Sequence, residues 1–389
     1  MANRWTILAA LFLARSAMGF QFQSVASLSP LISDSYGASL ADIGFLIGLY
    51  LAPGLIVALP GGAIAARFGD KRVVNLAMAM MLAGCVLISF GPGWNSLMAG
   101  RILAGAGGVM LNVVMTKMVV DWFAGREMST AMAIFINSWP VGIGLGLVAL
   151  PYVAETYDLA AAWSFVMVYV AVGWAVFAGI YRAPENAASV ATSVTAVSFP
   201  VVALGLAGVI WALYNAALAM VFSFGVEVLI ERGWALASAG SLTSSFMFVA
   251  SIALPLGGIL ADRTGRRDTV IAVSLLGYAC LMPLLLYAPA GAVPVVLAVA
   301  GALFALGGGP IMTLPAMVLS PKSRAFGMGV FFTIYYVLMM LAPGLAGALA
   351  EWTGSVGSAI WLGVGMVLIC LLALVLFRQS VARRAVVAA

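Results

Sequence analysis

The sequence predicts an all-α integral membrane protein whose twelve transmembrane helices form two six-helix, pseudo-symmetric halves. Hydrophobic residues make up 64% of the 389-residue chain and charged residues only 8%, with a mean hydropathy of +1.15. A water-exposed protein surface does not tolerate such a composition. Apolar runs of about 20 residues, long enough to span a bilayer as helices, recur throughout, and an internal repeat relates the two parts of the chain. A large soluble enzyme is thereby excluded.

Charged and turn-rich breaks between apolar runs predict the spans in chain order. They cover 5–33, 41–66, 73–91, 96–122, 128–153, 160–182, 199–230, 237–262, 268–289, 292–319, 325–350 and 356–378. The first span begins as a secretory signal does, with Arg4 before an apolar run, but it lacks a small-residue cleavage site. We therefore interpret it as a retained helix.

The longest polar interruption, rich in Ala, Ser and Thr, divides the chain. We expect an N-terminal half over 1–182, a cytoplasmic linker over 183–198, a C-terminal half over 199–378 and a cytoplasmic tail over 379–389. Basic residues gather in alternate loops and acids in the others, which by the positive-inside bias places both termini in the cytoplasm of a bacterial-type inner (plasma) membrane.

The net charge of +5 is spread over short loops, so the lipid bilayer is an expected partner and nucleic acid is not. Cys85, Cys280 and Cys370 lie far apart in apolar runs and predict neither a disulfide framework nor a metal site. No nucleophile motif or phosphate-binding loop is present, so we expect no enzyme activity, no cofactor and no use of ATP. A monomer is expected.

Proton coupling stays open at this point. Histidine is absent, so any proton chemistry depends on carboxylates. The candidates are acids at the outer helix ends, Glu227 or Glu231, whereas facilitated diffusion or anion exchange needs neither.

One offset of 196 residues relates the two halves. "LPGGAIAARFGDKR" at 59–72 corresponds to "LPLGGILADRTGRR" at 254–267. The offset pairs Gly62 with Gly258, Arg67 with Arg263, Gly69 with Gly265, Gly44 with Gly240, Met132 with Met328 and Glu155 with Glu351. Chance similarity among apolar helices does not keep glycines and charges in register, so the offset indicates two related six-helix halves.

The second copy of the loop resembles the major facilitator superfamily of secondary transporters. Gly258-x-x-x-Asp262-Arg263-x-Gly265-Arg266-Arg267 matches the family's G-x-x-x-D-R-x-G-R-R motif at every position, whereas the first copy has Ala66 where the acid belongs. The resemblance covers essentially the whole chain. It implies that Asp262 latches helix ends of opposite halves together in the outward-facing state.

Seven loop residues are therefore expected to act in gating, the alternative being that the arginines only anchor topology. They are Gly62, Arg67, Gly69, Gly258, Asp262, Arg263 and Gly265.

In the fourth span, Arg101, Gly105, Gly108 and Asn112 share one helix face, as in an arginine-plus-glycine motif of the superfamily. Glycines there let a neighbouring helix approach closely. Arg101 lies near the outer end of its span, where it could snorkel, so gating and structural roles stay open. In the fifth span "NSWPVGIGLGLVALP" resembles the family's antiporter motif only loosely, since Trp139 precedes Pro140.

Arg15 is the main candidate for a substrate anchor. At ~1.5 Å per residue it lies about 15 Å into the first span, near the bilayer midplane. Insertion there costs ~2.5–3.5 kcal/mol, so the side chain should face a cavity or a partner. No acid lies at comparable depth in another predicted span, and Lys117 and Asp121 are expected to form a local pair. An unpaired guanidinium suits a bound anion; hydrogen bonding to helix carbonyls or an interhelical role are the alternatives.

Helix faces and the repeat offset predict the neighbours of Arg15, which combine amides, hydroxyls and aromatic walls. The expected substrate-binding residues are Phe22, Gln23, Asn112, Asn137, Trp139, Trp211, Tyr214, Asn215, Tyr335 and Tyr336.

The leading functional hypothesis is a symporter or other secondary transporter of a small anionic substrate by alternating access. A nitrate/nitrite-type site is disfavoured, because the second and eighth spans carry no arginine before their inner ends. The segments at 243–267 and 325–336 resemble more closely the cyanate-permease or monocarboxylate-type branches of the superfamily. The alternative is a proton-coupled multidrug exporter, disfavoured because no acid lies deep in the first, fourth or fifth span. Nothing favours a membrane sensor, since neither tail is long enough for a signalling domain.

Overall fold

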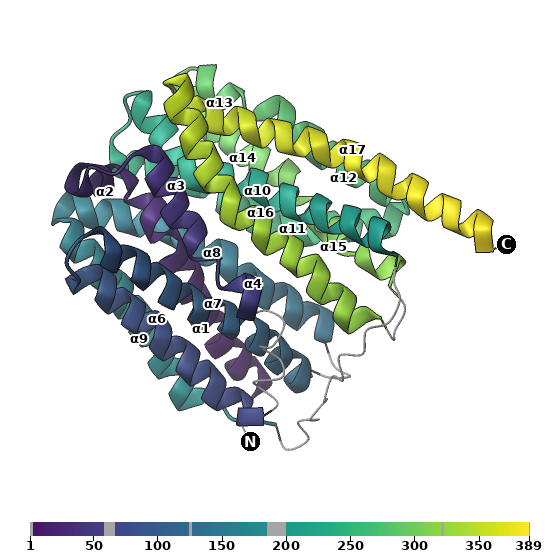
Figure 1. Ribbon diagram of the computed structural model, residues 1–389, viewed down its shortest axis with the longest axis horizontal. Coiled ribbons are helices and arrows are strands. Elements are labelled where there is room, and N and C mark those ends of the chain that lie inside the picture. The colour runs from purple at the N-terminus through teal and green to yellow at the C-terminus, as the bar shows by residue number, and fades with distance from the viewer. Residues whose placement is uncertain (1–2, 58–66, 124–126, 185–199, 320–322, 389) are drawn as a thin grey trace.

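The computed structural model describes residues 3–57, 67–123, 127–184, 200–319 and 323–388, and the regular elements among them are helical (Figure 1). The first half contains α1 (Arg4–Ser27), α2 (Ser29–Tyr36), α3 (Leu40–Leu49), α4 (Gly54–Val57), α6 (Asp70–Phe90), α7 (Trp94–Phe123), α8 (Met128–Thr156) and α9 (Leu159–Ile180). The second contains α10 (Val201–Glu231), α11 (Leu236–Thr264), α12 (Arg267–Leu281), α13 (Leu284–Tyr287), η1 (Ala290–Ala292), α14 (Val293–Ala305), α15 (Gly308–Met312), η2 (Pro315–Met317), α16 (Arg324–Thr353) and α17 (Gly357–Ala388).

Twelve helical stretches within the described ranges are long and apolar enough to cross a membrane, which confirms the predicted number of spans. Several spans are interrupted where the sequence predicted unbroken runs. The first breaks at Leu28, between α1 and α2, and the second breaks over 50–53, before α4. Pro53 and Pro283 lie at two of the breaks, as expected for a residue that lacks the backbone N–H and fixes its own φ.

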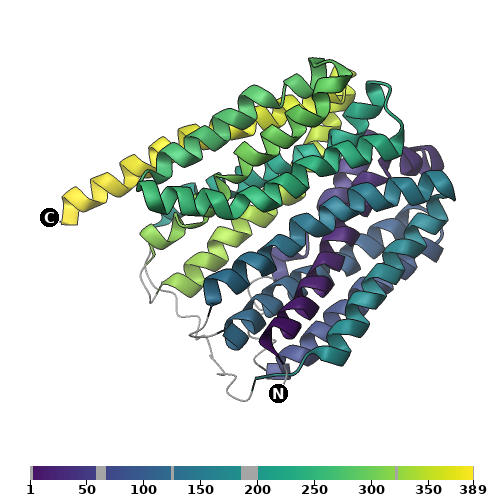
Figure 2. The same ribbon diagram turned by 180° about the vertical axis from the view of Figure 1, so that it is seen from behind.

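The helices form two groups that meet at one end of the bundle and diverge toward the other (Figures 1 and 2). We call the loops at 37–39, 157–158, 232–235 and 354–356 the closed end, and the segments at 67–69, 181–184 and 265–266 the linker end. The groups touch chiefly where α3 packs on α16 and α8 packs on α11, with a smaller contact of α1 on α10. Apart from 183–184, the predicted linker lies outside the described residues.

The two main crossings between the halves are copies of each other. A Cβ on Gly44 would lie 2.1 Å from the carbonyl oxygen of Pro343, and one on Gly240 would lie 2.2 Å from that of Leu147. Gly44 and Gly240 are 196 residues apart, and so are Leu147 and Pro343. Only a residue without a side chain permits these approaches, so the sequence repeat is also a repeat of packing.

A second pair of contacts across the halves follows the same offset. The backbone N–H of Ala237 donates to Oε1 of Glu155 at 2.9 Å, and that of Ala41 donates to Oε1 of Glu351 at 2.7 Å. Each acceptor lies near the carboxyl end of a long helix, and each donor lies in the first turn of a helix in the other half. The closed end is thus joined by two equivalent hydrogen bonds.

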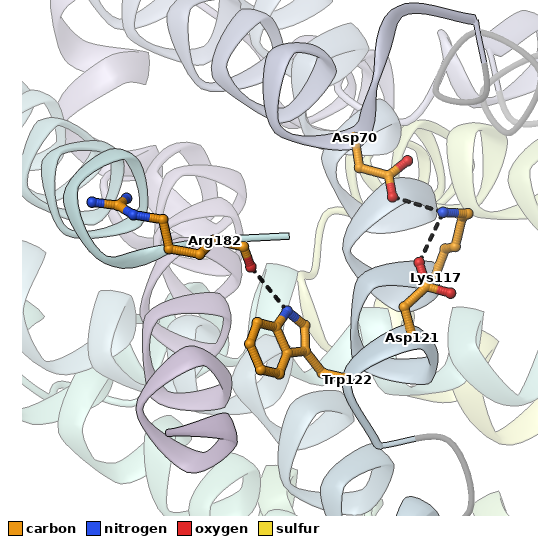
Figure 3. A network of polar contacts seen from close by, with 5 residues as sticks. All are labelled: Asp70, Lys117, Asp121, Trp122 and Arg182. Atoms are coloured by element: carbon orange, nitrogen blue, oxygen red, sulfur yellow. Dashed lines mark hydrogen bonds and ion pairs between the residues drawn. The ribbon is translucent and has the colours of Figure 1, made fainter. Parts of the chain in front are cut away.

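At the linker end of the first half, polar contacts tie α6, α7 and the segment after α9 together (Figure 3). Lys117 pairs with Asp121 at 2.8 Å, which confirms the expected local pair, and also with Asp70 at the start of α6, at 2.7 Å. Trp122 Nε1 donates to the carbonyl oxygen of Arg182 at 3.1 Å and joins α7 to the segment after α9. This network stays within one half.

Candidate functional site

A cavity of about 490 Å³ lies between the halves, within the size range of small-molecule sites. Its walls come from α1, α7 and α8 of one half and from α10, α11, α14, α15 and α16 of the other. The predicted residues that line it are Arg15, Asn112, Asn137, Trp139, Trp211, Tyr214, Asn215, Tyr335 and Tyr336. The structure therefore brings most of the predicted substrate-binding residues together around one space.

Arg15 is held at the cavity wall by hydrogen bonds to α7 and α8. Nε donates to Oδ1 of Asn112 at 2.9 Å. Nη1 lies within hydrogen-bonding distance of the carbonyl oxygens of Phe135 (3.0 Å) and Ile136 (2.9 Å) and of Oγ of Ser138 (3.0 Å). The guanidinium carbon also lies 4.8 Å from the ring centroid of Phe135. These contacts fix the orientation of the side chain.

Pro140 explains why α8 offers carbonyls to Arg15. Proline has no backbone N–H, so the carbonyl four residues earlier, that of Ile136, has no helical donor. In an apolar membrane environment such a freed carbonyl must find another donor, and Nη1 of Arg15 supplies it. Arg15 therefore satisfies the carbonyl that Pro140 leaves without a donor. Hydrogen bonding to helix carbonyls was one of the alternatives that the sequence left open for Arg15.

The remaining nitrogen of Arg15, Nη2, has no hydrogen-bond acceptor among the described residues, and no ion pair there involves Arg15. The side chain is only partly buried, because it borders the cavity. Both N–H groups of Nη2 are thus left to donate to a molecule in the cavity.

Two other polar atoms at the cavity wall are buried without a partner. They are Oδ1 of Asn137 on α8 and Nε1 of Trp211 on α10. Buried polar atoms in proteins are normally hydrogen-bonded, and each exception calls for an explanation such as a bound molecule. Both residues were predicted as site residues, and they come from opposite halves.

The other predicted polar side chains of α10 make their hydrogen bonds within the second half. Oη of Tyr214 donates to the carbonyl oxygen of Phe304 at 2.9 Å, and the two rings stack at 4.2 Å. Nδ2 of Asn215 donates to the carbonyl oxygen of Trp211 at 2.8 Å. The rings of Trp211 and Tyr335 lie 6.3 Å apart. This part of the wall is a set of packed aromatic rings.

Phe22 and Gln23 do not line the cavity. They are buried on its closed-end side, where the ring of Phe22 lies 5.1 Å from that of Trp139 and 5.7 Å from that of Phe222. Nε2 of Gln23 donates to the carbonyl oxygen of Phe222 across the halves, at 2.7 Å. In this conformation both residues join the halves next to the cavity.

Arg101 is fully buried, at 0% exposure, so the snorkelling considered from the sequence is wrong. Its donors reach backbone carbonyls of two helices: Gln21 (3.1 Å) and Phe22 (3.2 Å) of α1, and Leu46 (3.1 Å) and Ile47 (3.4 Å) of α3. The guanidinium also lies 4.6 Å from the ring centroid of Tyr50. Arg101 therefore clamps α1 to α3.

The loop residues predicted for gating lie at the linker end. Asp262 is exposed and pairs with Arg267 of its own loop at 3.3 Å, not with the opposite half. Gly69 (φ +85°) and Gly265 (φ +65°) adopt the left-handed conformation that their sharp turns need. Arg67 and Arg263 are exposed.

Of the two remaining glycines predicted for gating, Gly258 lies beside Gly309, where α11 approaches α15. Gly62 lies outside the described residues.

Sequence reasoning missed the methionines of the cavity wall. Six of them line it: Met18, Met132, Met247, Met312, Met328 and Met339. Their flexible thioether side chains adapt to ligands of varied shape. One signal was present, because Met132 and Met328 are related by the repeat offset, but methionine is too frequent in this chain for that pair to stand out.

Comparison with known proteins identifies relatives. The family model of the Major Facilitator Superfamily matches residues 11–231 and 201–388. A hexuronate transporter of Bacillus subtilis is 23% identical over 95% of this chain and 94% of its own length. Probable anion transporter 2 of rice chloroplasts is 26% identical, over 33% of this chain and 25% of its own length.

Among solved structures, a bacterial homologue of the human lysosomal transporter Spinster, in an inward-facing and occupied conformation, superposes with a TM-score of 0.73. The two chains are 16% identical, and the match covers 98% of this chain and 97% of the homologue. At this identity the likeness concerns the fold alone.

Proposed function

Because the chain belongs to the Major Facilitator Superfamily, we propose that it is a secondary active or facilitative transporter that carries a small organic anion by alternating access, with Arg15 as the anchor. The observation that carries this proposal is the pair of free N–H groups on Nη2 of Arg15, at the wall of a cavity between the halves. A transporter site at the interface of two repeats is the arrangement that alternating access requires.

A carboxylate is the ligand that suits Arg15 best. The two free N–H groups of Nη2 can each donate to a carboxylate oxygen, and such charge-assisted bonds are stronger than neutral ones. The described residues offer Arg15 no acid, so a bound anion supplies the compensating charge in an otherwise apolar space. The printed names of the relatives from Bacillus subtilis and rice, a hexuronate transporter and a probable anion transporter, agree with this chemistry.

For the membrane orientation, we propose that the linker end faces the cytoplasm. Arg67, Lys71, Arg263 and Arg267 lie there, whereas the closed end carries Glu155 and other acids. The positive-inside bias favours this placement, with both termini cytoplasmic. The end at which the halves diverge then faces the cytoplasm (Figure 1).

The competing function is a proton-coupled multidrug exporter, and one observation favours it. The cavity wall is rich in methionine and aromatic side chains, a composition typical of sites that accept varied apolar ligands. An arginine without an acid partner is unsuited to cationic drugs, however, because it repels them.

The test is ligand-induced stabilisation of the purified protein. We would measure the thermal unfolding of wild type, Arg15→Gln and Arg383→Gln against a panel of small carboxylates and lipophilic cations. A ligand at one hundred times its Kd stabilises the folded state by about 2.7 kcal/mol. We expect carboxylates to stabilise wild type and Arg383→Gln, which lacks the same charge in the exposed tail, but not Arg15→Gln. Stabilisation by cations alone, unchanged in Arg15→Gln, would contradict the proposal and favour the exporter.

A further inference from the structure

We infer that the transported anion is a hydroxylated carboxylate, with its carboxylate at Arg15 and hydroxyl groups at Asn137 and at Trp211. This inference rests on the proposed function and deepens it. The two atoms that carry it are Oδ1 of Asn137 and Nε1 of Trp211, both buried at the cavity wall and both without a hydrogen-bond partner.

Four other polar side chains at the wall already donate hydrogen bonds within the protein. Tyr214, Asn215, Ser251 and Thr116 each donate to a backbone carbonyl of the protein. Each thus uses one donor in holding the wall together. Asn137 and Trp211 are the residues of the described wall that carry a fully buried polar atom without a partner.

The two unpartnered atoms indicate which functional group a ligand needs at each position. The indole Nε1 is a donor and requires an acceptor, whereas the Oδ1 of an amide is an acceptor and requires a donor. If the amide of Asn137 is turned, its NH₂ group takes that position and requires an acceptor instead. A hydroxyl group answers either orientation, because it donates and accepts.

Other substituents fit less well. A plain hydrocarbon chain on the carboxylate leaves both atoms buried and unsatisfied, which is unfavourable for each. An ammonium group can donate to Asn137 but offers no acceptor to Trp211, and its charge opposes that of Arg15. A site built to hydrogen-bond a hydroxyl discriminates strongly against the analogue that lacks it.

The positions of the residues suit a ligand that spans the cavity. Arg15 and Asn137 belong to the first half and Trp211 to the second, and the repeat offset places Trp211 at the position equivalent to Arg15. A hydroxylated acid held by all three touches both halves. Its binding thus depends on how the halves are arranged, which is the coupling that alternating access needs.

The test compares matched ligands that differ only in their hydroxyl groups. We would measure the affinity of the purified protein for lactate and propionate, for gluconate and hexanoate, and for glucuronate and tetrahydropyran-2-carboxylate. We expect at least one hydroxylated acid to bind about tenfold or more tightly than its partner. Trp211→Phe and Asn137→Leu should each reduce this ratio toward one, whereas Trp352→Phe, which alters an exposed indole outside the cavity, should leave it unchanged.

The possible results separate the inference from the proposed function. Equal binding within each pair, abolished by Arg15→Gln, overturns the hydroxyl reading and leaves the anion transporter intact. Absence of Arg15-dependent binding by every hydroxylated acid overturns the inference as well. Binding of lipophilic cations alone overturns both.

A different observation carries a second inference: we propose that Glu155 and Glu351 are paired latches that hold the closed end shut. Each accepts a backbone N–H from the first turn of a helix in the other half, at 2.9 and 2.7 Å. Such N–H groups lack partners within their own helix, and the helix dipole favours a negative charge there. The N-cap residue of α11, Ala235, has no capping side chain, so Glu155 caps that helix from the opposite half.

The latches must break when the closed end opens, because they join the two parts that separate. In a background with Cys85, Cys280 and Cys370 replaced by Ala, we would place spin labels at Tyr157 and Tyr287, which are exposed at this end in opposite halves. We expect Glu155→Ala with Glu351→Ala to increase the long-distance population several-fold, and Asp158→Ala, an acid next to the same loop, to leave it unchanged. An unaltered distance distribution in the double variant would refute the latches.

Discussion

Two arginines inside the membrane-spanning helices mark two regions of this molecule that differ in how far their polar groups are satisfied. Around Arg101, every guanidinium nitrogen has a backbone carbonyl of α1 or α3 as acceptor, and the side chain is inaccessible. Around Arg15, Nη2 has no acceptor in the described residues, and the side chain borders a cavity. The difference teaches that two arginines in apolar spans can differ in hydrogen-bond saturation, and on this ground we propose a structural role for Arg101 and a binding role for Arg15.

The largest expected effect is the loss of stability in Arg101→Gln. The substitution removes several charge-assisted hydrogen bonds and leaves buried carbonyls of two helices without donors. We expect the free energy of unfolding to fall by on the order of 4 kcal/mol, to be measured by thermal or denaturant unfolding in detergent. An effect below about 1 kcal/mol would mean that the α1–α3 junction does not depend on this side chain.

The next effect is the loss of transport in Arg15→Gln. We expect uptake of the anionic substrate into proteoliposomes to fall about 100-fold, equivalent to about 2.7 kcal/mol of binding or transition-state free energy. Stability should fall less than in Arg101→Gln, because water in the cavity can reach the carbonyls that lose Arg15 as a donor. Normal transport with strongly reduced stability would reverse the comparison and make Arg15 the structural cation.

Lysine substitutions sharpen the distinction further. An ammonium group keeps the charge but cannot reach carbonyls on two helices as a planar fork does. We expect Arg101→Lys to lose about 2 kcal/mol of stability, and Arg15→Lys to keep an anion site with affinity reduced about tenfold. Unfolding curves and ligand titrations of the two variants, taken side by side, check this. Equal behaviour of both lysine variants would contradict the assignment of different roles.

The smallest effect is expected for Lys117→Gln at the linker end. Lys117 pairs with Asp70 and Asp121, but its side chain is 30% exposed and water screens the charges. Such pairs contribute about 1 kcal/mol or less. The variant should unfold slightly earlier and bind the anion as wild type does. A large loss of transport would place this network (Figure 3) in the transport cycle.

Part of the site could be predicted because depth and the repeat are properties of the sequence. Counting residues placed Arg15 deep in the first span, and the offset of 196 placed Trp211 at the equivalent position; both line the cavity. Phe22 and Gln23 share a helix with Arg15 but lie beyond the cavity, because α1 runs on toward the closed end. Helix periodicity predicts a face; where along that face the space lies depends on the partner helices.

The two arginines also could not be distinguished from sequence. Both lie in apolar spans without an acid nearby, and whether a guanidinium is saturated depends on carbonyls from other helices. Pro140 was a usable signal, because a proline within a span frees the carbonyl of Ile136. Nothing local to Arg101 indicated that α1 and α3 would surround it.

By itself, the sequence determined the fold class: composition excludes a water-exposed surface, apolar run length predicts twelve spans, and one offset predicts two halves. These properties are local or periodic, so they survive without knowledge of packing. The tertiary structure alone decided which polar atoms are left unpartnered, which end of the bundle is joined, and that Glu155 and Glu351 meet helices of the opposite half. Such features depend on which backbone groups come together from distant parts of the chain, and no single segment carries that information.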